Sequence, residues 1–107
     1  MIIKSEKSKK KIVGKMIINE YRINPDYSGA LIEINGKHGK IKCIGEDRTY
    51  FVVGGKGKFI INDKEKVVSK NDVIFIRKNT PYDIEGKMKF FLLCSPKFNA
   101  KHDVSLE

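Results

Sequence analysis

Arg48 and Tyr50 are the residues with the clearest potential for binding chemistry. They lie two positions apart in a run of β-branched and aromatic residues, so an extended strand would place both side chains on one face. A guanidinium is permanently charged and offers a planar fork of donors, and a phenol can donate or accept a hydrogen bond. The pair is therefore suited to an anionic group. In a competing interpretation, Arg48 forms a weak surface ion pair with Glu46 or Asp47.

Residues that bind metals or carry redox chemistry are scarce. The chain has two histidines, His38 in a predicted loop and His102 in the C-terminal tail, and His38 is most simply a solvated loop residue. Cys43 and Cys94 lie far apart without C-x-x-C spacing, so we predict two reduced, mostly buried thiols. A disulfide or a reactive thiol is the alternative.

The elements that must position these residues are short strands. Apolar, β-branched or aromatic runs occupy 30–34, 40–44, 49–53, 58–61, 66–68, 73–76 and 88–94, with two weaker candidates at 11–13 and 15–23. Turn signals stand between them at 35–36, 45, 54–57, 62–63, 70–72, 79–81 and 85–86. This spacing predicts an all-β barrel or sandwich, with at most one helical turn in the tail.

Composition limits the classes of protein to consider. The 107 residues fit one domain, and 40% hydrophobic with 33% charged residues is typical of a globular protein. The net charge of +9 comes mostly from lysines spread along the chain, and this pattern argues against nucleic-acid binding. There is no apolar run of about 18 residues for a membrane span and no apolar core of a signal peptide near the start, so we expect a cytoplasmic protein.

Two spaced motifs in the middle of the chain resemble those of the cupin family. The family motifs are written G-x5-H-x-H-x3-E-x6-G and G-x5-P-x-G-x2-H-x3-N, and their spacing is kept from Gly36 to Gly55 and from Asn71 to Gly86. The strings "YFVVGGKGKFIIND" and "NDVIFIRKNTPYDIEG" are similar to cupin sequences. Asn71 and Asn79 replace motif glycines, and asparagine tolerates positive φ better than other non-glycine residues.

The resemblance implies an all-β, double-stranded β-helix fold, the cupin or jelly-roll barrel. It covers most of the chain. It suggests a single cupin domain over residues 1–107, with the motif-bearing barrel at about 30–96, N-terminal strands within 1–29 and a short tail at 97–107.

The same alignment places Lys42, Ile44, Arg48 and Tyr82 where many cupins have metal ligands. Ammonium and guanidinium groups donate hydrogen bonds and do not ligate cations, so we expect no metal at that site and no cofactor. A metal-dependent cupin with non-standard ligands is an alternative.

The resemblance suggests a ligand-binding set made of Lys42, Arg48, Tyr50 and Tyr82 at the barrel mouth. A carboxylate, phosphate or enolate would match it. A strand register shifted by one residue would instead turn Lys42 outward and Cys43 inward. In a competing interpretation, Tyr82 is an aromatic residue at the rim of the core that bonds a backbone carbonyl.

The function that fits these features best is a metal-free cupin that binds a small anionic or sugar-like molecule, with no reaction assigned. The alternative enzyme is a cupin of the sugar-nucleotide isomerase or epimerase type, with His38 and Tyr82 as weak catalytic candidates. The enzyme hypothesis requires His38 to lie inside the barrel. A third hypothesis is a structural or regulatory domain whose barrel is filled and has no pocket. Residues 15–23 could supply an edge strand to a homodimer.

Overall fold

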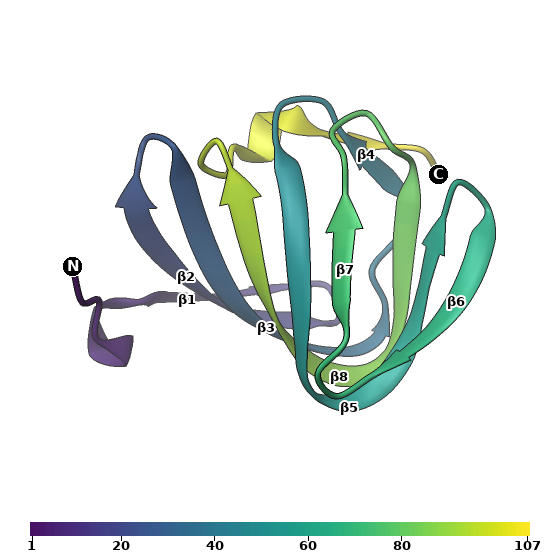
Figure 1. The fold of residues 1–107 in the computed structure, drawn as a ribbon, viewed down its shortest axis with the longest axis horizontal. Helices are drawn as coiled ribbons and strands as arrows, with labels where there is room; N and C mark the ends of the chain where they lie inside the picture. Colours follow the sequence, from purple (N-terminus) through teal and green to yellow (C-terminus); the bar gives the residue numbers. More distant parts are fainter.

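The computed structural model describes residues 1–107, and almost all of its regular structure is antiparallel strand (Figure 1). The strands are β1 (Lys9–Val13), β2 (Met16–Asn24), β3 (Tyr27–Lys37), β4 (Ile41–Cys43), β5 (Asp47–Ile61), β6 (Lys64–Ser69), β7 (Val73–Ile76), β8 (Tyr82–Ser95) and β9 (Asp103–Ser105). Two short 3₁₀ turns, η1 (Ser5–Lys7) and η2 (Ala100–His102), are the helical segments. The all-β prediction is confirmed. No helix has the length and apolar character that crossing a membrane requires.

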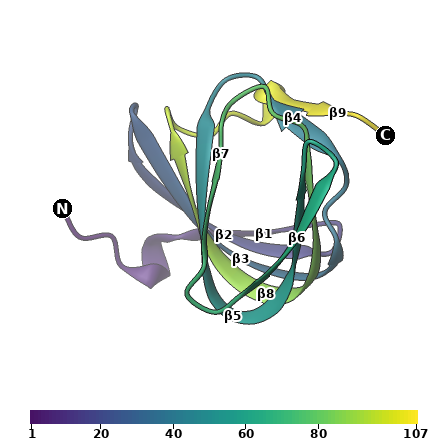
Figure 2. The same cartoon turned by 45° about the vertical axis from the view of Figure 1, so that its right-hand side comes forward.

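The sheet is organised around β8. Strand β5 pairs along one side of β8, and β3 followed by β4 pairs along the other. Strands β6 and β7 extend the sheet beyond β5, strands β2 and β1 extend it beyond β3, and β9 pairs with β4. The sheet curls until two walls face each other, as Figure 2 shows from the side. The core lies between these walls.

Residues 15–23 were predicted to supply a free edge strand, but the structure places most of them between two other strands. Strand β2, which contains most of residues 15–23, is flanked by β1 and β3 within the same chain. From Met16 to Glu20 this strand is therefore paired on both sides, and residues 21–24 pair with β3 alone. The edge strand here is β1, whose five residues are all exposed.

The longest strands bend where the sequence predicted turns. Residues 54–57 lie inside β5 and residues 85–86 lie inside β8, so neither is a hairpin turn, and residues 35–36 likewise lie within β3. A register shift between Val52 and Gly54 marks the bend in β5. Those turn predictions were wrong because glycine in a strand can also mark a sharp bend.

A row of three glycines lies across this bend. Gly36 pairs with Gly86, and Gly86 pairs with Gly57 on the next strand. A Cβ atom on Gly86 would lie 2.5 Å from the Cα of Gly57, and the φ of Gly86 is +145°. The backbones approach so closely that only glycine fits, and the sheet folds into two walls along this row.

The asparagine turns are confirmed. Asn71 has φ 75° and Asn79 has φ 69°, both in the left-handed region. The Asn71 amide donates to the Val52 carbonyl at 2.8 Å, and the Asn79 amide donates to the Cys43 carbonyl at 2.6 Å. The first turn is therefore hydrogen-bonded to β5 and the second to β4.

The core follows strict alternation along the strands. On β5, Arg48, Tyr50 and Val52 are buried, whereas Phe51 and Val53 between and beyond them are exposed. The inward residues pack with aromatic and aliphatic side chains from β6, β7 and β8. Arg48 and Tyr50 therefore lie on one inner face, as their spacing predicted.

Candidate functional site

A cavity of about 330 Å³ lies inside the barrel. Of its 15 lining residues, 11 are apolar, and the remainder are Lys11, His38, Arg48 and Asp103. Tyr50 also lines it and contributes a hydroxyl group. A mostly apolar cavity of this size with a few converging polar groups has the character of a small-molecule site. The barrel is therefore not completely filled by its own side chains.

Arg48 is the centre of a buried polar network. Its Nη1 donates to the Tyr82 hydroxyl at 2.8 Å, and its Nη2 donates to Glu46 Oε1 at 3.2 Å and to Asp103 Oδ1 at 2.6 Å. Arg48 is only 3% exposed, so its pair with Glu46 is buried and not the weak surface pair considered above. Only its Nε lacks a partner.

Tyr50 and Tyr82 form a hydrogen-bonded pair beside Arg48. Their hydroxyl oxygens are 2.7 Å apart, although the residues come from β5 and from the start of β8. Burial raises the pKa of both phenols, and the Arg48 charge partly opposes this at Tyr82. Both are thus neutral donors at neutral pH. Tyr50 lines the cavity, and Tyr82 lies behind it with 1% exposure.

His38 lies inside the barrel, which differs from the solvated loop position favoured by the sequence. Its ring stacks on Tyr82 with centroids 5.9 Å apart, and it lines the cavity. Its Nδ1 is 2.8 Å from the Gly39 carbonyl. A carbonyl oxygen only accepts, so Nδ1 carries the hydrogen and Nε2 keeps a lone pair.

The backbone around His38 is held in place from β8. The His38 amide donates to the Ile84 carbonyl at 2.8 Å, and the Gly39 amide donates to Asp83 Oδ1 at 2.9 Å. Asp83 also accepts from the Ile84 amide at 2.7 Å and is 7% exposed. Hydrogen bonds from two successive amides, those of His38 and Gly39, therefore hold the loop that carries the imidazole against β8.

Of the four predicted binding residues, Arg48 and Tyr50 line the cavity, Tyr82 lies behind it, and Lys42 is turned away from it. On β4, Ile41 lines the cavity and Cys43 is 3% exposed, so alternation turns Lys42 away from both. This is the register that the sequence left as an alternative. The neighbouring Ile44 is 46% exposed.

The four positions expected to hold metal ligands do not fit a divalent ion. Lys42 and Ile44 do not face the cavity, and Arg48 brings a permanent positive charge against the Tyr82 hydroxyl. No group of three or more His, Cys, Asp or Glu side chains is placed to hold a metal ion.

The C-terminal segment contributes residues that sequence reasoning missed. Asp103 binds Arg48, and His102 Nδ1 is 2.8 Å from Glu46 Oε2. Burial alone would raise the pKa of Glu46, but hydrogen bonds from His102, Cys43 and Arg48 hold it below its ordinary value. The two-residue spacing of Glu46 and Arg48 could have placed both carboxylate and guanidinium inside. No pattern in the tail indicated its role.

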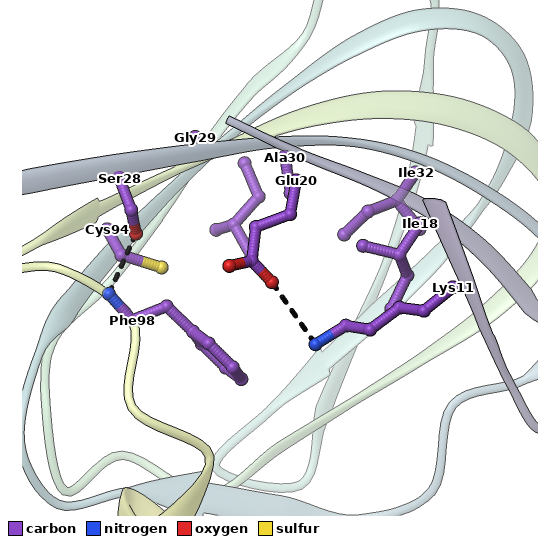
Figure 3. A pocket seen from close by; sticks show the side chains of 10 residues that line it. Lys11, Ile18, Glu20, Ser28, Gly29, Ala30, Ile32, Cys94 and Phe98 are labelled. Atoms are coloured by element: carbon purple, nitrogen blue, oxygen red, sulfur yellow. Dashed lines mark hydrogen bonds and ion pairs between the residues drawn. The ribbon is translucent and has the colours of Figure 1, made fainter. Parts of the chain in front are cut away.

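A second, smaller recess of about 50 Å³ adjoins this cavity (Figure 3). Phe98 lines both spaces, and its amide donates to Ser28 Oγ at 2.7 Å. Lys11 reaches across from β1 to Glu20, with Nζ 3.2 Å from Oε2. Cys94 borders the recess as a free thiol, and burial raises its pKa to about 12. The two spaces share five lining residues, which are Lys11, Ile18, Ile32, Leu92 and Phe98.

Comparison with known proteins identifies the fold through solved structures. No protein-family model matches the sequence, and neither does any curated protein. A structure of Pac13, described as a unique nucleoside dehydratase, matches with a TM-score of 0.92 at 21% identity, over 100% of this chain and 91% of that chain. Streptomyces Pac13 variants with one histidine or either of two tyrosines replaced, each solved with uridine, match with TM-scores of 0.91 to 0.92.

More distant structures share the same architecture. KdgF from a Halomonas species matches with a TM-score of 0.83 at 14% identity, over 94% of this chain and 97% of that chain. A variant of oxalate decarboxylase from Bacillus subtilis matches at 0.85 and 13% identity, over 97% of this chain and 32% of that one. With its curled antiparallel sheet, the chain is a small barrel of the cupin fold, the double-stranded β-helix.

Proposed function

We propose that this barrel binds a small, neutral, ring-shaped molecule such as a nucleoside or a related sugar, and removes a proton from it by acid–base catalysis. One observation carries the proposal. His38 and Tyr50 line the same apolar cavity, and the Gly39 carbonyl fixes His38 in the tautomer whose Nε2 can accept a proton.

The hydrogen-bond chain behind the cavity supplies a matching donor. Arg48 can only donate, so the Tyr82 oxygen accepts from it. If Tyr82 then donates to Tyr50, the Tyr50 hydrogen is left for a ligand in the cavity. Such a one-directional chain strengthens its last donor. Tyr50 is therefore the acid of this proposal, and Tyr82 positions it.

The charges around the cavity favour a neutral ligand over an anion. Both Nη atoms of Arg48 are engaged, and Glu46 and Asp103 together outweigh its single charge. Lys11 is paired with Glu20, and Lys42 does not face the cavity. A diphosphate, which a sugar-nucleotide isomerase would have to hold, finds no free cation here. Of the two ligand classes expected from the sequence, the sugar-like one is better supported than the anionic one.

The Pac13 variants add support. The substituted histidine precedes both substituted tyrosines in that chain, as His38 precedes Tyr50 and Tyr82 here, with similar separations. For loss of water, His38 Nε2 would take a proton from a carbon next to a carbonyl. A C=C bond would form, the C–O bond would break, and the Tyr50 proton would leave with the hydroxyl as water.

The test separates binding from turnover. Calorimetric titration with uridine, ribose and inorganic phosphate should show uridine binding most tightly and phosphate least. His38→Gln and Tyr50→Phe should keep uridine affinity within a few-fold but lower turnover of carbonyl-bearing nucleosides or sugars by about 10²–10⁴-fold. Tyr27→Phe, an exposed tyrosine outside the cavity, is the matched control.

Two results would overturn the proposal. Phosphate binding as strong as uridine binding would favour the anionic ligand class. Unchanged turnover in His38→Gln would remove the proposed base.

A further inference from the structure

The small recess beside the cavity is a part of the interior that the proposed acid–base chemistry does not use. It has a volume of about 50 Å³ and shares five of its ten lining residues with the larger cavity. Figure 3 shows the Phe98 ring beside the Lys11–Glu20 ion pair, where the two spaces meet. The recess therefore lies within reach of a group bound in the cavity.

The recess exists because the inward side chains of β3 become smaller toward the start of that strand. Ile32 points inward and is 5% exposed, and the next two inward positions are Ala30 and Ser28. Opposite Ser28 on β8 lies Cys94, another small side chain. Protein interiors are otherwise closely packed. The inner face of the sheet is therefore hollowed here, where large side chains would fill it.

The walls of the recess favour an apolar occupant over water. Six of its ten lining residues are hydrophobic, and the polar ones are engaged with one another. Lys11 Nζ is 3.2 Å from Glu20 Oε2, and Ser28 Oγ accepts from the Phe98 amide at 2.7 Å. A buried water needs polar partners, whereas an apolar group gains free energy by leaving bulk water.

The volume of the recess limits what can enter it. An apolar cavity of roughly 150 Å³ accepts a benzene ring, which has six carbon atoms. By the same proportion, the volume of about 50 Å³ accepts about two carbon atoms. A methyl or ethyl group therefore fits, and a further ring does not.

The recess lies beside the proposed acid, Tyr50. Strand pairing places Ala30, Leu92 and Tyr50 in one inward row across β3, β8 and β5. Neighbouring strands are about 4.8 Å apart, so the backbone of Ala30 is roughly 10 Å from that of Tyr50. His38 lines the cavity but not the recess. A ligand whose reacting carbon meets His38 and Tyr50 can therefore direct its far end toward Ala30.

We propose that the recess is a subsite that holds a short apolar branch of the ligand, and that Ala30 sets its depth. The proposal rests on the proposed function, which places a nucleoside or a related sugar in the cavity. When the sugar carries the carbonyl at His38 and Tyr50, the base lies at the far end of the ligand. The apolar edge of a uracil base is its C5–C6 edge. The ligand class is therefore a pyrimidine nucleoside with a methyl or ethyl group at C5.

Calorimetric titration with uridine, 5-methyluridine and 5-ethyluridine tests the subsite. The wild-type protein should bind 5-methyluridine about four-fold more tightly than uridine, which is the gain expected from burying one methylene group. 5-Ethyluridine should bind more tightly still. Ala30→Val fills the recess, so it should abolish or invert this preference while leaving uridine affinity within about two-fold. Val67→Ile, at an exposed position on β6, is the control and should keep the preference.

Xenon tests the recess without any nucleoside. Xenon enters small apolar cavities, so a wild-type crystal under xenon pressure should show the atom between Ala30, Leu92 and Phe98. A crystal of the Ala30→Val variant should not. Circular dichroism melts check that the variant is folded. If it does not fold, the nucleoside preference and the xenon position in the wild-type protein decide the proposal.

Three results would overturn the subsite. Equal wild-type affinity for uridine and 5-methyluridine would mean that no branch enters the recess, although uridine binding would leave the proposed function intact. A preference that persists in Ala30→Val would mean that Ala30 does not set the depth. Absence of xenon from the wild-type recess would mean that no apolar group can enter. Failure to bind all three nucleosides would instead contradict the proposed function, and xenon alone would then decide whether the recess takes an apolar group.

Discussion

At the scale of single residues, Arg48 decides the character of the site. Its three charge-assisted hydrogen bonds run to Tyr82, Glu46 and Asp103, and the planar guanidinium is the group that reaches all three at once. The sequence suggested that Arg48 is an unpaired cation able to bind an anion. In the structure its charge is neutralised by Glu46 and Asp103. Within this network Arg48 donates to Tyr82, and the Tyr82 hydroxyl is hydrogen-bonded to that of Tyr50.

Replacing Arg48 with lysine tests this role. A single ammonium cannot span the three acceptors, so Arg48→Lys should lower the free energy of unfolding by about 2–3 kcal/mol. Urea denaturation followed by circular dichroism measures the change. Arg77→Lys, at an exposed arginine, should change it by less than about 0.5 kcal/mol. Equal effects of the two substitutions would contradict the central role of Arg48.

At the scale of elements, the bend in the long strands makes the cavity possible. Strands β5 and β8 stay paired through the bend, so each contributes to both walls. The Gly36–Gly86–Gly57 row allows the backbones to approach there. A Cβ atom on Gly86 or Gly57 would meet backbone atoms of the neighbouring strand at less than 3 Å, so we expect a larger residue in this row to push β5 and β8 apart at the bend.

A pair of glycine substitutions tests the bend. Gly86→Ala adds a Cβ atom 2.5 Å from the Gly57 Cα at a φ of +145°, so it should destabilise the fold by about 2 kcal/mol or more. A Cβ atom on Gly54 meets nothing within 4 Å, so Gly54→Ala should have a far smaller effect. Thermal melts of the two variants decide the matter. A similar loss in both would mean that close approach is not what the glycine row provides.

At the scale of the whole molecule, one buried ionic network joins the C-terminal segment to the barrel. Glu46 is 1% exposed and bonds both Arg48 and His102, while Asp103 bonds Arg48 from the same segment as His102. Strand β9 holds this segment against β4. The carboxylates that bind Arg48 and His102 therefore attach to the barrel a segment whose Ala100 and Asp103 line the cavity.

The lowered pKa of Glu46 gives stability a defined pH dependence. A carboxyl whose pKa is lower in the folded than in the unfolded state adds stability above its ordinary pKa, 4.5. That contribution is lost as pH falls through the lowered value. Glu46→Gln should therefore flatten the acid limb of the unfolding free energy measured against pH, whereas Glu65→Gln, at an exposed glutamate, should leave the limb as in wild type. An unchanged limb in Glu46→Gln would contradict this account.

Local sequence determined much of the frame. Alternating apolar residues gave the strand positions, the tolerance of asparagine for positive φ gave two turns, and the spacing of Arg48 and Tyr50 gave their shared inner face. These features depend on the preferences of neighbouring residues, which a sequence carries directly.

Only the tertiary structure decided which residues meet. It turned Lys42 outward, brought His38 against Tyr82, and closed the polar network with Asp103 from a tail that carried no pattern. In addition, glycine-containing segments that were predicted as turns form bends within the long strands. These outcomes depend on strand register and on contacts between residues far apart in the chain. Such contacts are set by how the whole sheet buries its apolar face, and no local window of sequence contains that information.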